Sequence, residues 1–288
     1  MKVALALLAW CGILLQVCVG EPRSVTAAEN EGRELPFQLS SGYLIYVNGR
    51  IGDGRKLRFL LDTGSTVSLV DRRVADKNWV RTRQAESLSF NRTVTWDEAT
   101  VPEMQFGPIR VRNARVFVGK LDQLSELTNH IDAVIGLDLL SQRDFTVDYD
   151  ARKIIFHPGG AHEAISQGAE PASRCVVVEG LIQGHRVRLI VDTGFSGLLL
   201  YKERINKRIP TLRIDGAPKL VEVGKSLKAS QVSIPDVVVG SKRIDVRALL
   251  VNSPPENVAA EIDGVLGPSA LNAHKLHFDL ARRTIDWD

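Results

Sequence analysis

Two aspartates stand in the same short motif at two distant places in the chain. The sequence Asp-Thr-Gly occurs at 62–64 and again at 192–194, each time directly after an apolar run. At average composition a given tripeptide occurs by chance at roughly one position in several thousand. Two copies with matching flanks therefore indicate one shared site, to which each loop contributes a carboxylate.

Two carboxyl groups at one site have a defined chemistry. If Asp62 and Asp192 lie close together, like-charge repulsion prevents both from ionising, and one proton is shared over a wide range of pH. The ionised group then acts as a base on a water molecule, and the protonated group acts as an acid. Because such a pair titrates as a unit, its pKa values belong to the pair.

The elements that must position these loops are themselves repeated. Ile131 to Gly136 (IDAVIG) is matched by Ile262 to Gly267 (IDGVLG), and the spacing from each aspartate to the later glycine is nearly the same in both halves. Each half also ends in alternating residues around a turn, at 145–156 and at 277–287, which predicts a terminal hairpin. A duplicated domain explains this internal repeat most economically.

Most other segments have the pattern of short strands. They are rich in Val, Ile, Leu and Thr and are separated by Gly, Asn or Asp, so the sequence predicts an all-β fold. We expect an N-terminal domain at 33–157, a linker at 158–173 and a C-terminal domain at 174–288. Short helices are predicted at 71–77, 139–143, 202–207 and 269–274.

These residues resemble the aspartic peptidases, in which two Asp-Thr/Ser-Gly loops meet across a pseudo-twofold axis. In that family an apolar-apolar-Gly segment is threaded behind each loop through a ψ-shaped loop. The size of each half and the run at 135–140 (IGLDLL) are more similar to retropepsin-type domains than to the lobes of pepsins. The resemblance implies two retropepsin-like β-barrel domains in one chain, with Asp62 and Asp192 as the catalytic pair.

The resemblance also implies roles for the residues that follow each aspartate. Thr63 and Thr193 would form an interlocking pair, in which each hydroxyl donates to the backbone of the opposite loop. Gly64 and Gly194 would allow the backbone to bend tightly and would point amides at the carboxylates.

The two loops are nevertheless unequal. Ser65 follows the first glycine, whereas Phe195 follows the second, where the family more often has Ala, Ser or Thr. We expect the Ser65 hydroxyl to stabilise ionised Asp62. Phe195 offers no hydrogen bond and is expected to desolvate Asp192, which would then hold the resting proton. The alternative is that Phe195 crowds the cleft and abolishes activity.

A flap is expected between the two signatures of each half. In the first half, 87–96 alternates like a hairpin with 91–92 near its tip. Trp96 in this segment is a candidate for covering substrate, and core packing is the alternative. In the second half, 221–230 is the counterpart, with Gly224 and Lys225 near its tip.

Composition excludes several classes of partner. The chain is 44% hydrophobic and 25% charged, which is ordinary for a globular protein, and its net charge of +3 comes from scattered residues. Without a clustered basic stripe, nucleic acid is not expected as a partner. The six histidines show no metal-ligand spacing, so neither a metal nor another cofactor is expected.

The N-terminus has the pattern of a secretory signal. Met1-Lys2 precedes an uncharged, Leu-rich run at 3–19, and cleavage would follow Gly20 or come as late as residue 28. An uncleaved membrane anchor is the alternative, although the run falls short of the ~20 residues of a spanning helix. Only Cys175 lies beyond this leader, so the mature chain is expected to form no internal disulfide.

Together these features predict an exported, periplasmic or secreted, aspartic endopeptidase. It would hydrolyse peptide bonds in extended peptide or protein substrates, as a monomer whose two aspartates meet in cis. The alternative to an enzyme is an inactive peptide-binding or scaffolding protein with the duplicated fold. Phe195 is the residue that motivates this hypothesis. A third arrangement pairs each half with a half of another chain.

Overall fold

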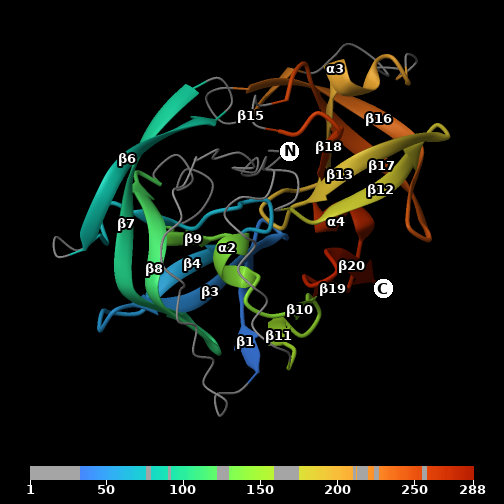
Figure 1. The fold of residues 1–288 in the computed structure, drawn as a ribbon. Helices are drawn as coiled ribbons and strands as arrows, with labels where there is room; N and C mark the ends of the chain where they lie inside the picture. The colour runs from blue at the N-terminus through green and yellow to red at the C-terminus, as the bar shows by residue number, and fades with distance from the viewer. Residues whose placement is uncertain are drawn as a thin grey trace.

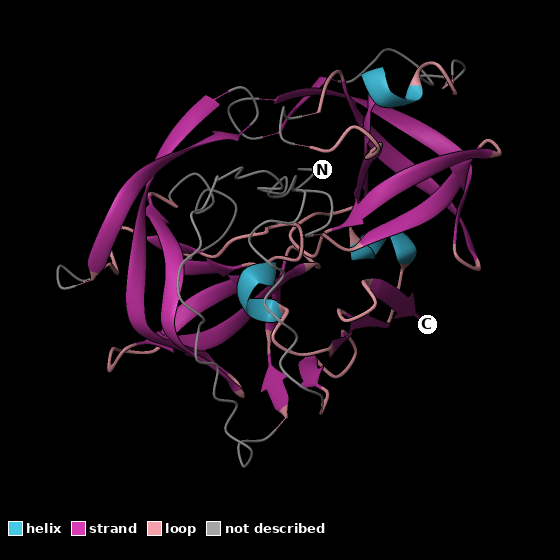
Figure 2. Ribbon diagram, in the orientation of Figure 1, coloured by secondary structure: helices cyan, strands magenta, loops and turns pink. Residues whose placement is uncertain are grey.

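The structure is a computed structural model that describes residues 33–75, 79–89, 92–121, 130–158, 175–209, 212, 220–223, 227–254 and 258–288. These residues are mainly strands, with a few one-turn helices (Figure 2). None of the helices in these ranges is both long enough and apolar enough to cross a bilayer. The predicted leader lies outside them.

The first half folds into a closed barrel of six strands. In ring order these are β3 (Leu44–Ile51), β4 (Leu57–Leu61), β9 (Ala133–Ile135), β5 (Leu69–Asp71), β8 (Ile109–Gly119) and β7 (Arg92–Phe106). The ring closes because β3 also pairs with β7. Two further strands extend the sheet, β2 (Gln38–Ser40) beside β3 and β6 (Val80–Ser89) beside β7.

The second half repeats the ring of six strands. Its ring consists of β12 (Val177–Ile182), β13 (His185–Val191), β18 (Gly264–Leu266), β14 (Leu198–Tyr201), β17 (Lys242–Val251) and β16 (Leu227–Val239). The pairing of β12 with β16 closes it, and β15 (Leu220–Val223) extends it beside β16. The predicted all-β fold of two related barrels is confirmed (Figure 1).

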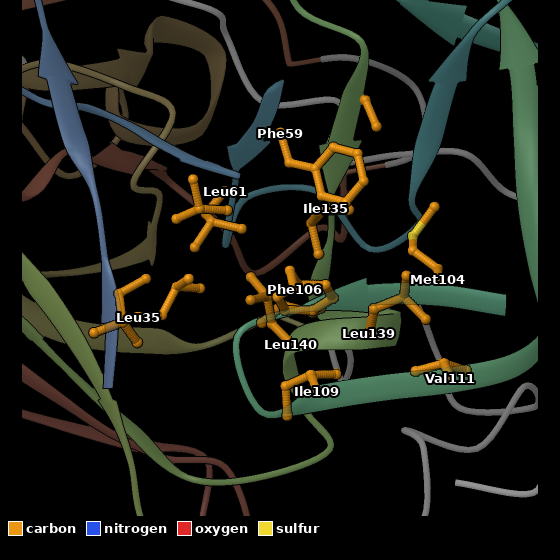
Figure 3. Packing of buried hydrophobic residues seen from close by; sticks show 14 of the residues in the cluster. Leu35, Phe59, Leu61, Met104, Phe106, Ile109, Val111, Ile135, Leu139 and Leu140 are labelled. Carbon is orange, nitrogen blue, oxygen red and sulfur yellow. The ribbon is translucent and has the colours of Figure 1, made fainter. Parts of the chain in front are cut away.

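Alternation along the strands gives each barrel a buried interior. On β3, Ile45 and Val47 belong to the first core cluster, most of whose residues come from the first half, whereas Tyr46 belongs to a second cluster. Figure 3 shows the first cluster, where side chains of β4, β7, β8 and β9 meet. Both clusters take residues from both halves, and Leu60 and Ile190 are examples in the second cluster. Burial of this apolar surface therefore holds the two barrels together.

Behind each Asp-Thr-Gly loop, one strand is threaded between two others. β9 lies between β4, to which it is parallel, and β5, to which it is antiparallel, and β18 lies in the same way between β13 and β14. Gly136 and Gly267 follow these threaded strands. A Cβ would lie 2.5 Å from the Val67 carbonyl oxygen at the first and 2.2 Å from that of Phe195 at the second. The close approach of the loop therefore requires glycine at both positions.

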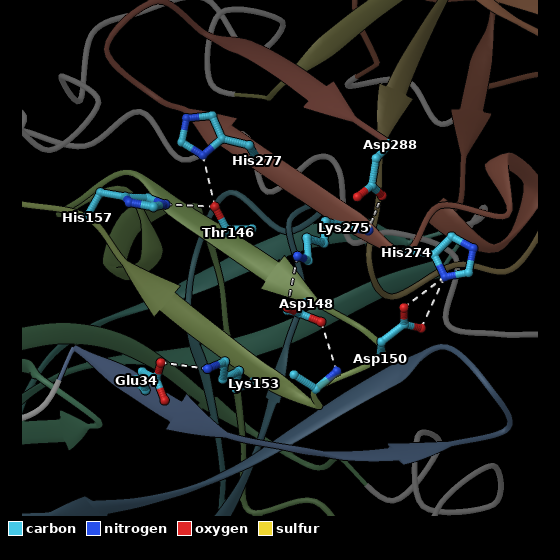
Figure 4. Close-up of polar contacts among 11 residues, drawn as sticks. Glu34, Thr146, Asp148, Asp150, Lys153, His157, His274, Lys275, His277 and Asp288 are labelled. Atoms are coloured by element: carbon cyan, nitrogen blue, oxygen red, sulfur yellow. Dashed lines mark hydrogen bonds and ion pairs between the residues drawn. The ribbon is translucent and has the colours of Figure 1, made fainter.

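An antiparallel sheet of five strands joins the halves. Its order is β1 (Glu34–Pro36), β11 (Lys153–Phe156), β10 (Phe145–Asp148), β19 (Lys275–Asp279) and β20 (Thr284–Trp287). β10 pairs with β19, which sets Phe145 opposite Phe278 with ring centroids 4.7 Å apart. The ion pair of Lys275 with Asp148 also crosses this junction (Figure 4). The predicted terminal hairpins are confirmed, and they pair with each other.

The predicted helices are only partly correct. Within the described ranges, α2 (Leu137–Leu140), α3 (Lys202–Ile205) and α4 (Pro268–Leu271) overlap three of them. The helix predicted at 71–77 is wrong for its described part, because Asp71 ends β5 and turns the chain. The Asp71 carboxylate accepts hydrogen bonds from the amides of Arg73 at 2.8 Å and Leu121 at 2.9 Å, which compete with helical bonding.

The predicted flap hairpins are present. β6 pairs with β7 in the first half, and β15 pairs with β16 in the second. Their tips, at 90–91 and 224–226, lie outside the described residues, as does most of the linker predicted at 158–173.

Candidate active site

Asp62 and Asp192 directly follow β4 and β13, two equivalent strands. The amide of Asp62 donates to the Ile135 carbonyl at 3.0 Å, and the amide of Asp192 donates to the Leu266 carbonyl at 3.0 Å. Each threaded strand therefore fixes the start of the loop that carries an aspartate.

Two threonines interlock the loops. The Thr63 hydroxyl donates to the Val191 carbonyl at 2.9 Å, and the Thr193 hydroxyl donates to the Leu61 carbonyl at 3.1 Å. Each hydroxyl also accepts a hydrogen bond from the amide of the other threonine, at 3.1 Å in both directions. All these groups are buried, where an unmade hydrogen bond is costly. The four bonds fix the separation of the two loops.

The interlocked loops bring the two carboxyl groups together. Asp62 and Asp192 are both 0% exposed, and each side chain lies against the glycine of the opposite loop. A Cβ on Gly64 would lie 2.4 Å from the carboxyl carbon of Asp192, and one on Gly194 would lie 3.0 Å from that of Asp62. Each glycine therefore leaves the space that the opposite carboxyl group occupies.

Backbone amides point at both carboxyl groups. Asp62 Oδ1 accepts from Gly64 at 2.9 Å and from Ser65 at 3.2 Å. Asp192 Oδ1 accepts from Gly194 at 2.7 Å. Burial raises the pKa of Asp62, while the neighbouring Asp192 side chain and the hydrogen bonds from the two amides act in the opposite direction. The pair is thus suited to hold a proton at a pH where an exposed aspartate has lost it.

Ser65 supports Asp62 through its amide and not through its hydroxyl. The hydroxyl donates to the Val67 carbonyl at 2.7 Å, so the expectation that it stabilises the carboxylate is wrong. A hydroxyl has one hydrogen to donate, and the Val67 carbonyl within the loop accepts it.

Phe195 is fully buried in the second cluster, which both halves form. Its amide donates to the Asp192 carbonyl oxygen at 3.2 Å and closes the turn of the loop. The same cluster contains Leu199 and Tyr43. This placement adds apolar surroundings near the second aspartate.

Trp96 on β7 is also fully buried. A Cβ on Gly119 would lie 2.3 Å from its ring, so this glycine makes room for the indole. The placement favours core packing, and contact with substrate stays a prediction.

Tyr43 was missed in the sequence. It follows a turn in which Ser41 and Gly42 have positive φ, and it is buried. Burial raises the pKa of Tyr43, and the charges of Tyr46 and Asp192 add to this effect. Tyr43 belongs to the first half, yet the charge of Asp192 in the second half helps to raise its pKa. No motif marks it, because only the packing of the two halves brings it there.

No group of three or more His, Cys, Asp or Glu side chains suited to a metal ion occurs in the part of the chain that the structure describes.

A comparison with protein families decides the relationship. The family model described as aspartyl protease matches the chain twice, at residues 47–139 and 178–270. The chain belongs to the aspartyl protease family. Each match contains one Asp-Thr-Gly loop and the threaded strand behind it, so the protein is a tandem of two retropepsin-like domains. A search of curated proteins finds no significant match.

Proposed function

We propose that this protein is an exported aspartic endopeptidase with one active site, formed by Asp62 and Asp192 of the same chain. The observation that carries the proposal is the pair of interlocked loops, on which two buried carboxyl groups lie close together. Burying ionisable groups side by side costs stability. A protein that only binds peptides has no need of this cost.

In the proposed reaction Asp62 is the base and Asp192 is the acid. Two amides donate to Asp62 Oδ1 and favour its ionised form. A water molecule loses a proton to Asp62 and adds to the peptide carbonyl carbon, while Asp192 donates its proton to the carbonyl oxygen. The tetrahedral intermediate breaks down as a proton passes to the leaving nitrogen, and no bond forms between enzyme and substrate.

The substrate is proposed to be an extended peptide. The hairpins β6–β7 and β15–β16 stand at equivalent places in the two halves. There they would cover a strand-like segment and form hydrogen bonds with its backbone. Trp96 is proposed to contact that segment.

Cleavage of a mixed peptide library tests the proposal. The mature protein, Asp62→Asn and Asp192→Asn are compared between about pH 3 and about pH 7, so that the rate is followed while one proton of the pair is lost. Each variant should lose at least about 100-fold in rate, because one remaining carboxyl group cannot act as both acid and base. Cutting at the wild-type rate by either variant would exclude the dyad mechanism.

The second candidate function is a peptide-binding protein without turnover, and Phe195 is the residue that favours it. The family more often has a small or hydroxylated residue there, and the large ring is buried in the cluster between the halves. Binding of library peptides without cleavage by the wild type at any pH would support this function.

Export and a monomeric state are part of the proposal. The uncharged run at 3–19 after Met1-Lys2 supports export, and the pairing of β10 with β19 supports a site built within one chain. N-terminal sequencing of the exported protein should show removal of the leader after residue 20 or as late as 28. Retention of residues 1–20 would support a tethered form, and light scattering that shows only dimers would contradict the monomer.

A further inference from the structure

A hydrogen-bonded chain behind the first catalytic loop ends on a carboxylate. The Ser68 hydroxyl donates to Asp138 Oδ1 at 2.6 Å. Its oxygen accepts from the amide of Gly136 at 3.0 Å. Ser68 is fully buried, so its hydroxyl has no water to replace either partner.

The same chain continues to the catalytic loop through the backbone. The amide of Leu137, the next residue after Gly136, donates to the Ser65 carbonyl oxygen at 2.8 Å. Ser65 in turn donates its amide to Asp62 Oδ1 at 3.2 Å. The position of this amide relative to the carboxylate therefore depends on where the peptide at 136–137 is held.

The second catalytic loop is anchored by a different set of groups. Pro268 stands where the first half has Leu137, and proline has no N–H to donate. Ser269 stands where the first half has Asp138, and its hydroxyl oxygen accepts from the amide of Gly197 at 3.1 Å. At this pair of equivalent positions, the first half supplies a carboxylate and the second a neutral hydroxyl.

We propose that Asp138 is a positioning residue for Asp62: it orients the Ser68 hydroxyl, and so holds the backbone that keeps the Ser65 amide on the Asp62 carboxylate. This inference rests on the proposed function, in which Asp62 is the base. It gives the inequality of the two loops a structural origin outside the Asp-Thr-Gly motifs.

The physical reason is the single hydrogen of a hydroxyl group. Because that hydrogen is directed to the carboxylate of Asp138, the lone pairs of Ser68 face the amide of Gly136. An apolar residue at 138 frees the hydroxyl to rotate, and the peptide at 136–137 loses its anchor. Of the two hydrogen bonds that backbone amides donate to Asp62, the one from Ser65 is the longer. Weakening it raises the pKa of Asp62.

Carboxyl ¹³C NMR titration of Asp-labelled protein tests this without requiring turnover. The wild type, Asp138→Leu, Asp138→Asn and Ser68→Ala are titrated, and Asp62→Asn identifies the signal of Asp62. Asp138→Leu and Ser68→Ala should move the titration midpoint of Asp62 upward by on the order of half a pH unit, since the hydrogen bond from the Ser65 amide to the carboxylate is weakened. In Asp138→Asn the amide oxygen still accepts from Ser68, so the midpoint should not rise.

The sign of the shift separates positioning from a simple charge effect. Removing a negative charge lowers the pKa of a nearby carboxyl group, so a through-space effect would move Asp138→Leu and Asp138→Asn downward together. Ser269→Ala is the matched variant in the second half, and it should not raise the Asp62 midpoint. A midpoint in Asp138→Leu that is unmoved or lower would overturn the proposal.

Two further outcomes are informative. If Asp138→Leu does not fold, Ser68→Ala carries the test, and an unmoved midpoint there overturns the proposal equally. The acid limb of the pH-rate profile should follow the NMR midpoint in each variant. An inactive wild type with the expected shifts would sink the proposed function alone, whereas an active wild type without them would sink only the role of Asp138.

Discussion

At the scale of single residues, the sequence identifies the two aspartates but not everything around them. Asp-Thr-Gly is visible because its spacing and flanks recur. The direction of the Ser65 hydroxyl, which bonds to Val67, was not predictable, because it depends on how the loop turns. Tyr43 and Asp138 were missed for a related reason: each lies near the site only because segments far apart in the sequence come together.

The interlocking threonines give a prediction at this scale. Thr63→Val keeps the shape of the side chain but leaves the Val191 carbonyl and the Thr193 amide without their buried partner. Each unsatisfied group costs about 1–3 kcal/mol, so the free energy of unfolding in urea should fall by at least about 2 kcal/mol. The rate of peptide cleavage should fall with it.

Thr63→Ser is the control for this prediction. It restores the hydroxyl, so most of the lost stability and activity should return. If Thr63→Val were as stable and as active as the wild type, the hydrogen bonds between the loops would not set the geometry of the site.

At the scale of elements, periodicity predicted most strands, and the repeat predicted which of them correspond. The helix at 71–77 failed in its described part because the side chain of Asp71 bonds to backbone amides, a local competition that propensity does not register. The pairing of β10 with β19 could not be predicted either. Both hairpins are visible in the sequence, but nothing in their patterns says that one pairs with the other.

The threaded strand gives a prediction for elements. Gly136→Ala places a Cβ about 2.5 Å from the Val67 carbonyl oxygen, so the catalytic loop must move away from β9. Overpacking of this kind costs about 1–3 kcal/mol, and thermal unfolding should show the loss together with reduced cleavage. Gly184→Ala is the comparison. Gly184 has a φ of +79°, but a Cβ added there would meet no atom within 4 Å outside its chain neighbours. This substitution should affect stability and leave the catalytic rate constant unchanged. Equal effects on that rate constant would contradict the role given to Gly136.

At the scale of the whole molecule, the two barrels act as one unit because a shared sheet and a shared cluster join them. The hydroxyl of Thr146 on β10 lies 2.7 Å from Nε2 of His157 and 3.0 Å from Nδ1 of His277 on β19 (Figure 4). Burial and the neighbouring His277 lower the pKa of His157, with a smaller contribution from Arg33, while Asp144 acts in the opposite direction. The stability of this junction between the halves should therefore depend on pH.

The direction of that coupling follows from linkage. Below the unfolded value, about 6.5 for histidine, the folded protein binds fewer protons at His157 than the unfolded chain does. The contribution of His157 is thus fully present above about pH 6.5 and is lost as pH falls toward the folded pKa. His157→Gln should lose less Tm than the wild type between about pH 7.5 and about pH 5. Parallel Tm curves for the two proteins would contradict this.

In the proposed reaction one site is completed within one chain, and a mixing experiment tests that most directly. Asp62→Asn and Asp192→Asn are assayed for peptide hydrolysis separately and as an equimolar mixture, beside the wild type. We predict that the wild type cleaves, and that neither variant nor their mixture does, because each molecule lacks one carboxyl group of its own pair. Cleavage by a single variant at the wild-type rate, or recovery of activity on mixing, would contradict the account.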